Sequence, residues 1–455
     1  DENDIGKHYY QLKEKNTNVK TELIAGLTTF LAMAYILGVN PAILGDAGMD
    51  THSVFMATAI SAAFASVVMG LVANYPVALA PGMGVNALFA YTVVSEMGYS
   101  WQAALAAVLV SGIVFLIISV TGIRKMIINA IPVQLKLAIG AGIGFFIAFV
   151  GLKNAGIIVA SSSTFVALGK FSTPTVLLAT FGILITIFLV IKKVPAGVFV
   201  GMVITAIVGL IAHEAFGVSV LDSVTKAELM PALPGNAITT NFDMSTLGAF
   251  ASGFGELFAN PGKAFVIIFS FLFVDFFDTA GTLVAIGNKI GLVNEKGELE
   301  NAEQALVADS IGTVAGAVLG TSTVTSFVES SSGVGVGGRT GLTAVTAGVL
   351  FLLSIFISPV VLSTAVSAVT APALVVVGIM MVQQLGGVDW NDMVFTSAGF
   401  VTILVMILSY SISNGIALGF ITYAVAMIAA GKIKEISPII WVLVLIFVLY
   451  FGWLI

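Results

Sequence analysis

Three carboxylates stand inside otherwise apolar stretches of this chain. Asp275 and Asp278 lie three residues apart in FLFVDFFDTAGTL, residues 271–283, and Glu329 stands before a run of glycines. An ionised side chain at the centre of a bilayer costs about 2.5 to 3.5 kcal/mol on insertion scales, so three represent roughly 8 to 10 kcal/mol. Protonation, a polar ligand or a cation would offset this cost. These acids are therefore the candidate functional residues.

The spacing of the two aspartates favours proton uptake and release. Residues i and i+3 share a helix face, which predicts that Asp275 and Asp278 both point into the protein rather than toward lipid. Burial and a neighbouring like charge each favour the neutral form of a carboxyl group, so one of the set can hold a proton and release it when water enters. Alternatively, each acid is structural and accepts a hydrogen bond from a nearby backbone N–H.

The composition is that of an integral membrane protein. The 455 residues are 58% hydrophobic and 9% charged, and the mean hydropathy of +1.09 lies far outside the range of soluble domains. Apolar stretches long enough to cross a hydrocarbon core of roughly 30 Å recur from about residue 20 onward. They are apolar all round, unlike the alternating strands of a porin-like barrel. We expect an all-α polytopic fold embedded in a lipid bilayer.

The sequence gives no sign of a metal, a cofactor or a nucleic-acid partner. It has no cysteine, and its three histidines, His8, His52 and His213, lie far apart. The net charge of −6 is modest and does not indicate nucleic-acid binding. GVGVGG, residues 333–338, fits GxGxxG, but no acidic residue follows before Asp389, whereas a dinucleotide site needs one about 20 positions later.

Hydropathy divides the chain into two sets of seven spans. We expect an N-terminal segment over residues 1–19, a first repeat over 20–214, a connection over 215–261, and a second repeat over 262–455 that includes an extra apolar stretch from 436. Because seven is odd, the second repeat starts from the opposite side of the membrane, which makes the repeats inverted. The expected spans are 20–40, 52–73, 76–96, 100–121, 131–151, 173–191, 194–214, 262–287, 302–320, 322–338, 341–358, 365–384, 392–411 and 413–430.

Positive charges predict the orientation. Lys7, Lys13 and Lys15 precede the first span and Lys20 begins it, Arg124 and Lys125 follow the fourth, and Lys192 and Lys193 follow the sixth. Cytoplasmic loops carry an excess of Lys and Arg. The N-terminus is therefore expected in the cytoplasm, and the connection over 215–261 on the extracytoplasmic side.

Both repeats contain an interrupted segment at the matching position. The third span includes ALAPGMGVNALFAY, residues 78–91, where Pro81 and two glycines precede Asn86, and the tenth includes TSTVTSFVESSSGVGVGGRTGL, residues 321–342. Both predict extended backbone at membrane depth, which is tolerated only where protein buries it or it lines a cavity. The Asn86 amide could face this crossing, or it could cap the helix that resumes after it.

Five motifs in order give the chain a nearly full-length resemblance to the purine permease branch of the nucleobase-cation symporter superfamily. They are TELIAGLTTFLAMAYILGVNP, PVALAPGMGVNALFAY, VDFFDTAGTLV, FVESSSGVGVGGRTGLTAV and GIALGFITYA. The resemblance implies about 14 transmembrane segments as two inverted repeats of seven, core and gate domains, and short strands in segments 3 and 10. It further implies a bacterial inner-membrane symporter that imports a purine such as hypoxanthine, guanine or adenine with protons.

The resemblance also implies which groups hold the base. Carboxylates accept hydrogen bonds from purine N–H and amino groups, and an asparagine amide both donates and accepts. Uracil carriers have a histidine where this chain has Thr279, so no proton relay through that position is implied. The expected proton-coupling residues are Asp275, Asp278 and Glu329. The expected substrate-binding residues are Asn86, Asp275, Thr279, Phe327, Val328 and Glu329.

The sequence also allows other interpretations of the coupling ion, the assembly and the function. Na+ is an alternative coupling ion, and a homodimer is a candidate assembly. An anion carrier for sulfate or bicarbonate could share the architecture, although basic residues would then be expected at the two interruptions. An intramembrane aspartyl protease would need a tyrosine-aspartate pair and a GxGD stretch, and the sequence has neither. We therefore expect a transporter rather than an enzyme.

Overall fold

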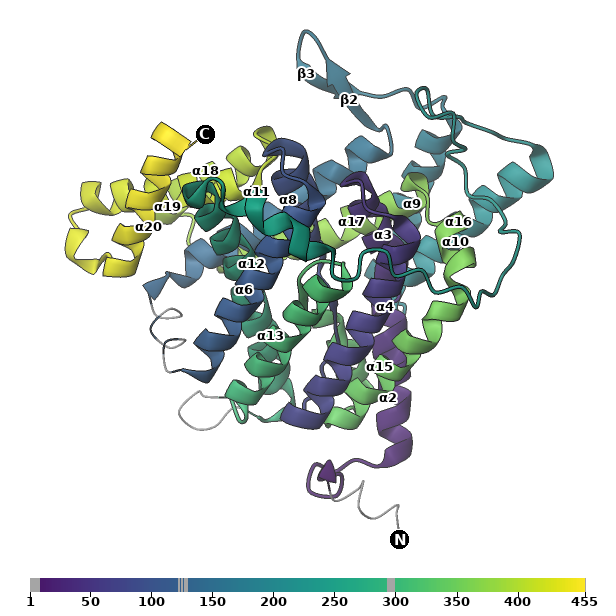
Figure 1. Ribbon diagram of the computed structural model, residues 1–455, viewed down its shortest axis with the longest axis horizontal. Coiled ribbons are helices and arrows are strands. Elements are labelled where there is room, and N and C mark those ends of the chain that lie inside the picture. The colour runs from purple at the N-terminus through teal and green to yellow at the C-terminus, as the bar shows by residue number, and fades with distance from the viewer. Residues whose placement is uncertain (1–8, 122, 124–125, 127–129, 293–298, 455) are drawn as a thin grey trace.

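Helices make up most of the protein, as the composition predicts (Figure 1). Within the part of the chain that the structure describes, nine helices are long and apolar enough to cross a membrane. Arg124 and Lys125, which contribute to the charge pattern above, lie outside that part, as does His8. The computed structural model describes residues 9–121, 123, 126, 130–292 and 299–454.

The first repeat follows the expected spans, with one addition. Two strands form an antiparallel hairpin over 158–168, between the fifth and sixth segments, which the hydropathy pattern did not predict. The elements are α2 (Val19–Met33), α3 (Ile36–Asp46), α4 (Thr51–Val68), η1 (Met69–Ala73), β1 (Leu79–Pro81), α5 (Met83–Ala87), η2 (Leu88–Glu96), α6 (Trp101–Val120), α8 (Val133–Asn154), β2 (Ile158–Ser161), β3 (Phe165–Leu168), α9 (Pro174–Ile191), α10 (Gly197–Leu210) and η3 (Ile211–Ala215).

The second repeat follows a mainly irregular connection, and like the first it has a short strand, β4, in its third segment. The elements are η4 (Ala249–Gly253), α11 (Phe254–Phe258), α12 (Pro261–Ile290), α13 (Ala302–Leu319), β4 (Val324–Ser326), η5 (Val328–Ser330), α14 (Ser331–Gly335), α15 (Gly341–Leu353), η6 (Ser354–Ile357), α16 (Ser358–Thr364), α17 (Ser367–Val382), η7 (Gln383–Gly387), α18 (Met393–Leu408), α19 (Ile412–Ala429), η8 (Ile433–Glu435), α20 (Pro438–Leu449) and η9 (Tyr450–Leu454).

Polar residues just before the helices explain where several of them begin. The side chains of Asn18, Asp50, Ser100 and Asn260 accept hydrogen bonds from backbone N–H groups in the first turns of α2, α4, α6 and α12. These N–H groups have no partner within their own helix. Gly291 adopts a left-handed conformation and ends α12. The helix boundaries are thus set locally, by residues that the sequence shows.

Helix packing shows the inverted repeat directly. In one group α4 packs on α15 while α6 packs on α13, and in the other α8 packs on α18 while α9 packs on α17. Helices α4 and α6 of the first repeat correspond to α13 and α15 of the second, so the α4–α15 contact is the counterpart of the α6–α13 contact. In the same way α8 and α9 correspond to α17 and α18, so the α8–α18 contact is the counterpart of the α9–α17 contact. We call the group of α2 to α6 and α12 to α16 the core domain, and the group of α8 to α10 and α17 to α19 the gate domain. The predicted architecture of two inverted repeats is confirmed.

The two interrupted segments meet as paired strands inside the core domain. β1 and β4 are antiparallel, with Leu79 opposite Ser326 and Pro81 opposite Val324. The Phe327 N–H continues the pairing to the Ala78 carbonyl at 3.0 Å. Extended backbone at membrane depth therefore finds its hydrogen bonds in the other repeat rather than in lipid. The predicted short strands in segments 3 and 10 are confirmed.

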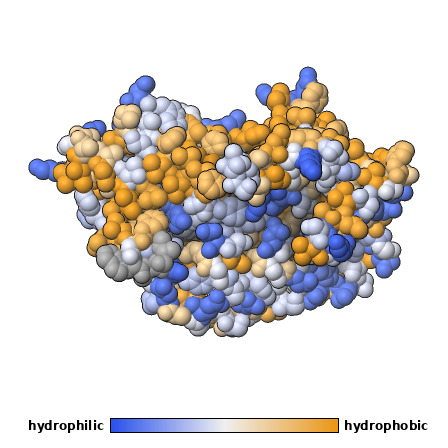
Figure 2. Space-filling model, turned by 90° about the horizontal axis from the view of Figure 1, so that it is seen from above, coloured by the Kyte–Doolittle hydropathy of each residue, from blue (hydrophilic) through white to orange (hydrophobic). Residues whose placement is uncertain are grey.

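The outer face of the helix bundle is apolar. On α9, the exposed large side chains recur every three or four residues, which is the spacing of one helix face. Viewed from above, hydrophobic residues gather along the top and both sides of the outline, and more hydrophilic residues occupy its centre (Figure 2). This distribution suits contact with lipid around the rim. The exposed side chains of α9 are Leu177, Phe181, Leu184, Phe188 and Ile191.

Different elements lie at the two ends of the bundle. We call the end at which the N-terminus lies the proximal end (Figure 1). The opposite end, where α3 and α8 finish and the β2–β3 hairpin projects, is the distal end (Figure 1). At the proximal end the Asn74 amide donates to the Tyr10 carbonyl at 3.1 Å, which places the N-terminal residues there.

A glycine pair allows α15 to approach η1 closely, and this predicts a sensitive position. A side chain on Gly341 would overlap the Gly70 carbonyl oxygen. Gly341→Ala should therefore lower the free energy of unfolding by about 1 to 3 kcal/mol, as overpacked sites do. Thermal unfolding in detergent measures this loss. Gly255→Ala, with no atom within 4 Å of the added carbon, is the control, and equal melting temperatures for the two variants would contradict the expectation.

Candidate functional site

Asp278 and Glu329 are the two predicted acids that stay accessible. Asp278 is exposed, and Glu329 is partly exposed. Val328, beside Glu329, is 50% exposed although it lies next to the buried strand β4. The Thr325 hydroxyl on β4 reaches Asp278 at 3.5 Å, so Asp278 faces the interrupted segment and not the outer surface. The two carboxylates act on each other electrostatically. We call the accessible region around Asp278, Val328 and Glu329, beside β4, the opening.

Tyr35 connects this opening to the first repeat. Its hydroxyl donates a hydrogen bond of 2.7 Å to Oε1 of Glu329, and its side chain is buried. Tyr35 lies just before α3, at the break between the two helices of the first segment. The hydroxyl leaves Oε2 of Glu329 free of that bond, so one carboxylate oxygen is positioned while the other stays available to a ligand.

Asp275 lies elsewhere, in a fully buried pair with Asp309 of α13. Their carboxyl groups are within hydrogen-bond reach of each other, and two carboxyl groups bond only when one carries a proton. The Thr313 hydroxyl donates to Oδ2 of Asp275 at 2.7 Å. Oδ2 of Asp309 is buried and accepts no hydrogen bond from a neighbouring donor, which fits a proton shared with Asp275.

The pair also fixes the end of β4. Oδ1 of Asp309 accepts hydrogen bonds from the Ser326 backbone N–H and hydroxyl, both at 2.9 Å, and from the Thr279 hydroxyl at 2.9 Å. Asp309 therefore ties α13 to the strand that precedes Glu329. Asp275 and Asp278 share a helix side, as the spacing predicts, but they have different partners: Asp275 faces α13 and Asp278 faces β4.

Asn86 is buried in a polar network that joins the two repeats. Its amide nitrogen donates to Oδ1 of Asn40, and its oxygen accepts from the Ser322 hydroxyl. Asn40 in turn donates to Thr58 at 2.6 Å and to Thr321 at 2.8 Å. Both ends of the Asn86 amide are thus occupied by protein groups. In this conformation it positions the interrupted segments and offers nothing to the opening.

The other predicted residues divide in the same way. Val328 is exposed beside Glu329, whereas Phe327 is 6% exposed and belongs to the hydrophobic core. Thr279 is fully buried and directs its hydroxyl to Asp309. Of the predicted residues, the structure therefore leaves Asp278, Val328 and Glu329 accessible at the opening. It buries the other four inside the protein: Asn86, Asp275, Thr279 and Phe327.

The core and gate domains pack against each other near the opening. Their side chains form one continuous buried cluster that includes Met83, Ile143, Phe146 and Phe271. Gly84 of α5 faces Ile143 of α8 so closely that a side chain carbon on Gly84 would lie 3.0 Å from it.

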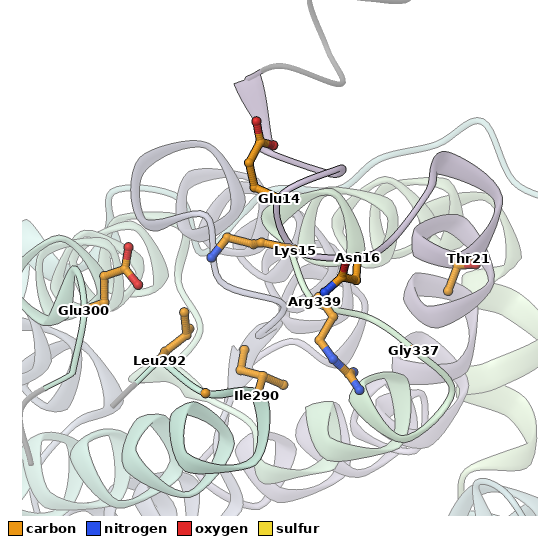
Figure 3. A pocket seen from close by; sticks show the side chains of 10 residues that line it. Glu14, Lys15, Asn16, Thr21, Ile290, Leu292, Glu300, Gly337 and Arg339 are labelled. Carbon is orange, nitrogen blue, oxygen red and sulfur yellow. The ribbon is translucent and has the colours of Figure 1, made fainter. Parts of the chain in front are cut away.

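A separate pocket of about 510 Å³ lies at the proximal end (Figure 3). It is lined by residues of the N-terminal segment, of the end of α12 and of the loop after α14, and Lys15 and Arg339 both extend along it (Figure 3). None of the predicted site residues lines it. Arg339 is held there by hydrogen bonds from its guanidinium to the Val334 and Gly338 carbonyls.

Comparison with known proteins identifies the family. The family model Xan_ur_permease, described as "Permease family", matches residues 20–418. The chain belongs to this permease family. Since the family and the relatives below are permeases, the protease interpretation is set aside, and the protein is a membrane transporter rather than an enzyme.

Relatives and solved structures agree with this assignment. The permease is 47% identical over 462 residues to the guanine/hypoxanthine permease PbuG of Bacillus subtilis, covering 98% of this chain and 100% of the relative. It is 42% identical over 440 residues to the adenine permease AdeP of Escherichia coli, covering 97% and 94%. These matches confirm the resemblance to the purine permease branch.

A solved structure supports the fold alone. The transmembrane domain of the cyanobacterium bicarbonate transporter BicA superposes with a TM-score of 0.59 at 17% identity, over 91% of this permease and 97% of that chain. At this level of identity the match says that the backbone architecture is shared. It carries nothing about what this permease transports.

Sequence reasoning missed Asp309 and Tyr35. Asp309 is a fourth acid inside an apolar span, so the cost of a buried charge was a signal that could have found it. Tyr35 stands in an apolar segment among many aromatic residues, and nothing in its spacing links it to Glu329. Only the packing of α3 against the tenth segment reveals that contact.

The shared proton between Asp275 and Asp309 predicts the outcome of a paired substitution. Asp309→Asn keeps an oxygen that accepts from Ser326 and supplies an amide that donates to Asp275, so folding stability should stay near that of the wild type. Asp309→Ala leaves Asp275 without this partner and should cost at least about 2 kcal/mol. Thermal unfolding in detergent compares the two, and equal losses would show that the carboxyl pair is not bonded.

Proposed function

We propose that this permease imports purine nucleobases together with protons, by alternating access of the core domain against the gate domain. The observation that carries the proposal is the pair of accessible carboxylates, Asp278 and Glu329, beside the interrupted segment of the second repeat. Relatives of the chain are named guanine/hypoxanthine and adenine permeases. The proposal extends beyond the family assignment in three respects: the substrate of this chain, its coupling ion and its orientation.

The groups around the opening suit a flat, nitrogen-rich ring. Carboxylate oxygens of Asp278 and Glu329 can accept hydrogen bonds from ring N–H and exocyclic amino groups. Val328 offers backbone groups between them. The Tyr35 hydroxyl holds Glu329 in place, which lowers the entropy lost when the base binds. Acids around the opening also disfavour sulfate or bicarbonate, so the nucleobase reading is preferred to the anion carrier.

Proton coupling follows from the electrostatics of the same two residues. Two nearby carboxylates repel each other, and a bound neutral base removes the water that screens them. Taking up one proton relieves this repulsion and leaves one carboxylate to hold the base. The base and the proton would then move together, because each lowers the cost of binding the other. Asp275 and Asp309 would hold a second proton behind the site, where the Thr279 hydroxyl contacts both carboxyl groups.

We propose that this conformation is inward-open, with the opening at Asp278 reached from the proximal end. With the N-terminus in the cytoplasm, as the positive-inside rule predicts, the proximal end faces the cytoplasm and the distal end faces outward. The opening is then the route by which an imported base leaves. We propose a bacterial inner membrane as the location, since relatives such as PbuG and AdeP are bacterial.

Neutral substitutions of the accessible acids test the site. Asp278→Asn and Glu329→Gln should each reduce initial uptake of radiolabelled hypoxanthine at least about tenfold, since a hydrogen bond to a charged group is worth about 1.5 to 3 kcal/mol. Glu256→Gln is the matched control, because Glu256 is a carboxylate bonded to Ser100, away from the opening. Uptake at the wild-type rate in both site variants, at equal membrane abundance, would refute the assignment.

A competition panel tests substrate and ion together. Unlabelled hypoxanthine, guanine and adenine should displace the labelled base, and uracil, sulfate and bicarbonate should not. An inward proton gradient should drive accumulation in proteoliposomes without sodium, and an uncoupler should abolish it. Accumulation that follows a sodium gradient instead would favour Na+ coupling, and inhibition by sulfate alone would favour the anion carrier.

A further inference from the structure

The core and gate domains are joined at the distal end by a small cluster of polar side chains. Asp46 at the end of α3 and Tyr91 in η2 belong to the core domain, and Lys153 and Asn154 at the end of α8 belong to the gate domain. Tyr410, which follows α18, completes the cluster from the gate side. We call these five residues the distal latch.

Asn154 makes the bridging contacts. Its side-chain nitrogen donates to Oδ2 of Asp46 at 3.4 Å and to the Tyr91 hydroxyl at 3.2 Å. The Tyr91 hydroxyl itself donates to Oδ2 of Asp46 at 2.7 Å. A core carboxylate and a core hydroxyl therefore converge on one gate amide. The bonds within the core are short, whereas those across the boundary are long and so easier to break.

Two aromatic residues and a lysine extend the boundary contact. The rings of Tyr91 and Tyr410 lie 5.8 Å apart. The Lys153 ammonium lies 4.4 Å from the centre of the Tyr410 ring and 3.4 Å from its hydroxyl, and it attracts Asp46 electrostatically. Opposite charges from the two domains thus face each other across the boundary.

Two further bonds join the domains beneath the latch. The backbone N–H of Ile412 in the gate donates to Oγ1 of Thr92 in the core at 3.0 Å. The hydroxyls of Ser270 on α12 and Ser413 on α19 lie 2.9 Å apart. These two bonds add to the contacts that the latch makes between the core and gate domains.

The latch is suited to repeated opening. Asp46 and Lys153 are exposed, and Asn154 is partly exposed, so water can replace the lost partners when the domains separate. A buried charge pair would instead impose a large desolvation cost. The exposed cluster can thus favour one arrangement of the domains without locking it.

We propose that the distal latch holds the core domain to the gate domain while the site is open at the proximal end, and that it breaks when the site opens at the distal end. The inference rests on the proposed transport by alternating access. In this proposal, Asn154 and Asp46 set the equilibrium between the two conformations and do not contact the substrate.

Cysteine labelling tests the latch without using any substrate. The chain has no cysteine, so Ile143→Cys introduces one thiol at the buried boundary between α8 and Gly84. A membrane-impermeant maleimide applied from the distal side labels this thiol only when that side opens. Adding Asn154→Leu removes the bonds to Asp46 and to Tyr91 and should raise the labelling rate at least about tenfold, since the bond to a charged group alone accounts for that factor.

The controls separate a latch from general loosening. Ser358→Ala removes a distal-end hydrogen bond to His52 that lies within the core domain, and it should leave the labelling rate unchanged. Asn154→Asp should raise the rate by placing a second carboxylate beside Asp46. Asp46→Asn with Asn154→Asp exchanges the amide and carboxylate and should restore slow labelling.

The result decides the proposal independently of what the permease carries. Wild-type labelling rates in Asn154→Leu and Asn154→Asp, with both variants folded by gel filtration, would overturn it. An equal rise in Ser358→Ala, or no rescue by the exchanged pair, would overturn it as well. Absence of purine uptake would count against the proposed function and leave the labelling experiment fully interpretable.

Discussion

The rest of this structure depends on the pairing of β1 with β4. A chain that stops two helices at membrane depth exposes backbone N–H and C=O groups that lipid cannot satisfy. Here each interrupted segment supplies the partners that the other lacks, from Leu79 opposite Ser326 to Pro81 opposite Val324. This pairing creates a polar region in the middle of an apolar bundle. The carboxylates, the asparagine network and the opening all collect around it.

Residues of the same type in that region have different neighbours and therefore different roles. Asp275 and Asp278 are one turn apart on α12, yet one is buried against Asp309 and the other is exposed at the opening. The buried pair secures the strand that precedes Glu329 through Ser326.

The core and gate domains meet through apolar packing around Ile143 and Phe146 and through the polar contacts of Asn154. Asp278 and Val328, by contrast, remain accessible. In transporters built from inverted repeats, each half can adopt the arrangement of the other, which is the basis of alternating access.

The sequence by itself determined the membrane setting, the two sets of seven segments, the breaks at Pro81 and before Glu329, and the presence of costly acids, since hydropathy and helix breakers act locally. It could not determine that Asp275 pairs with Asp309, that Asn86 is satisfied by Asn40 and Ser322, or that Tyr35 reaches Glu329. Those contacts join residues far apart in the chain. They exist only because the folded core domain brings the two repeats together, and only tertiary structure decides which polar group a buried side chain meets.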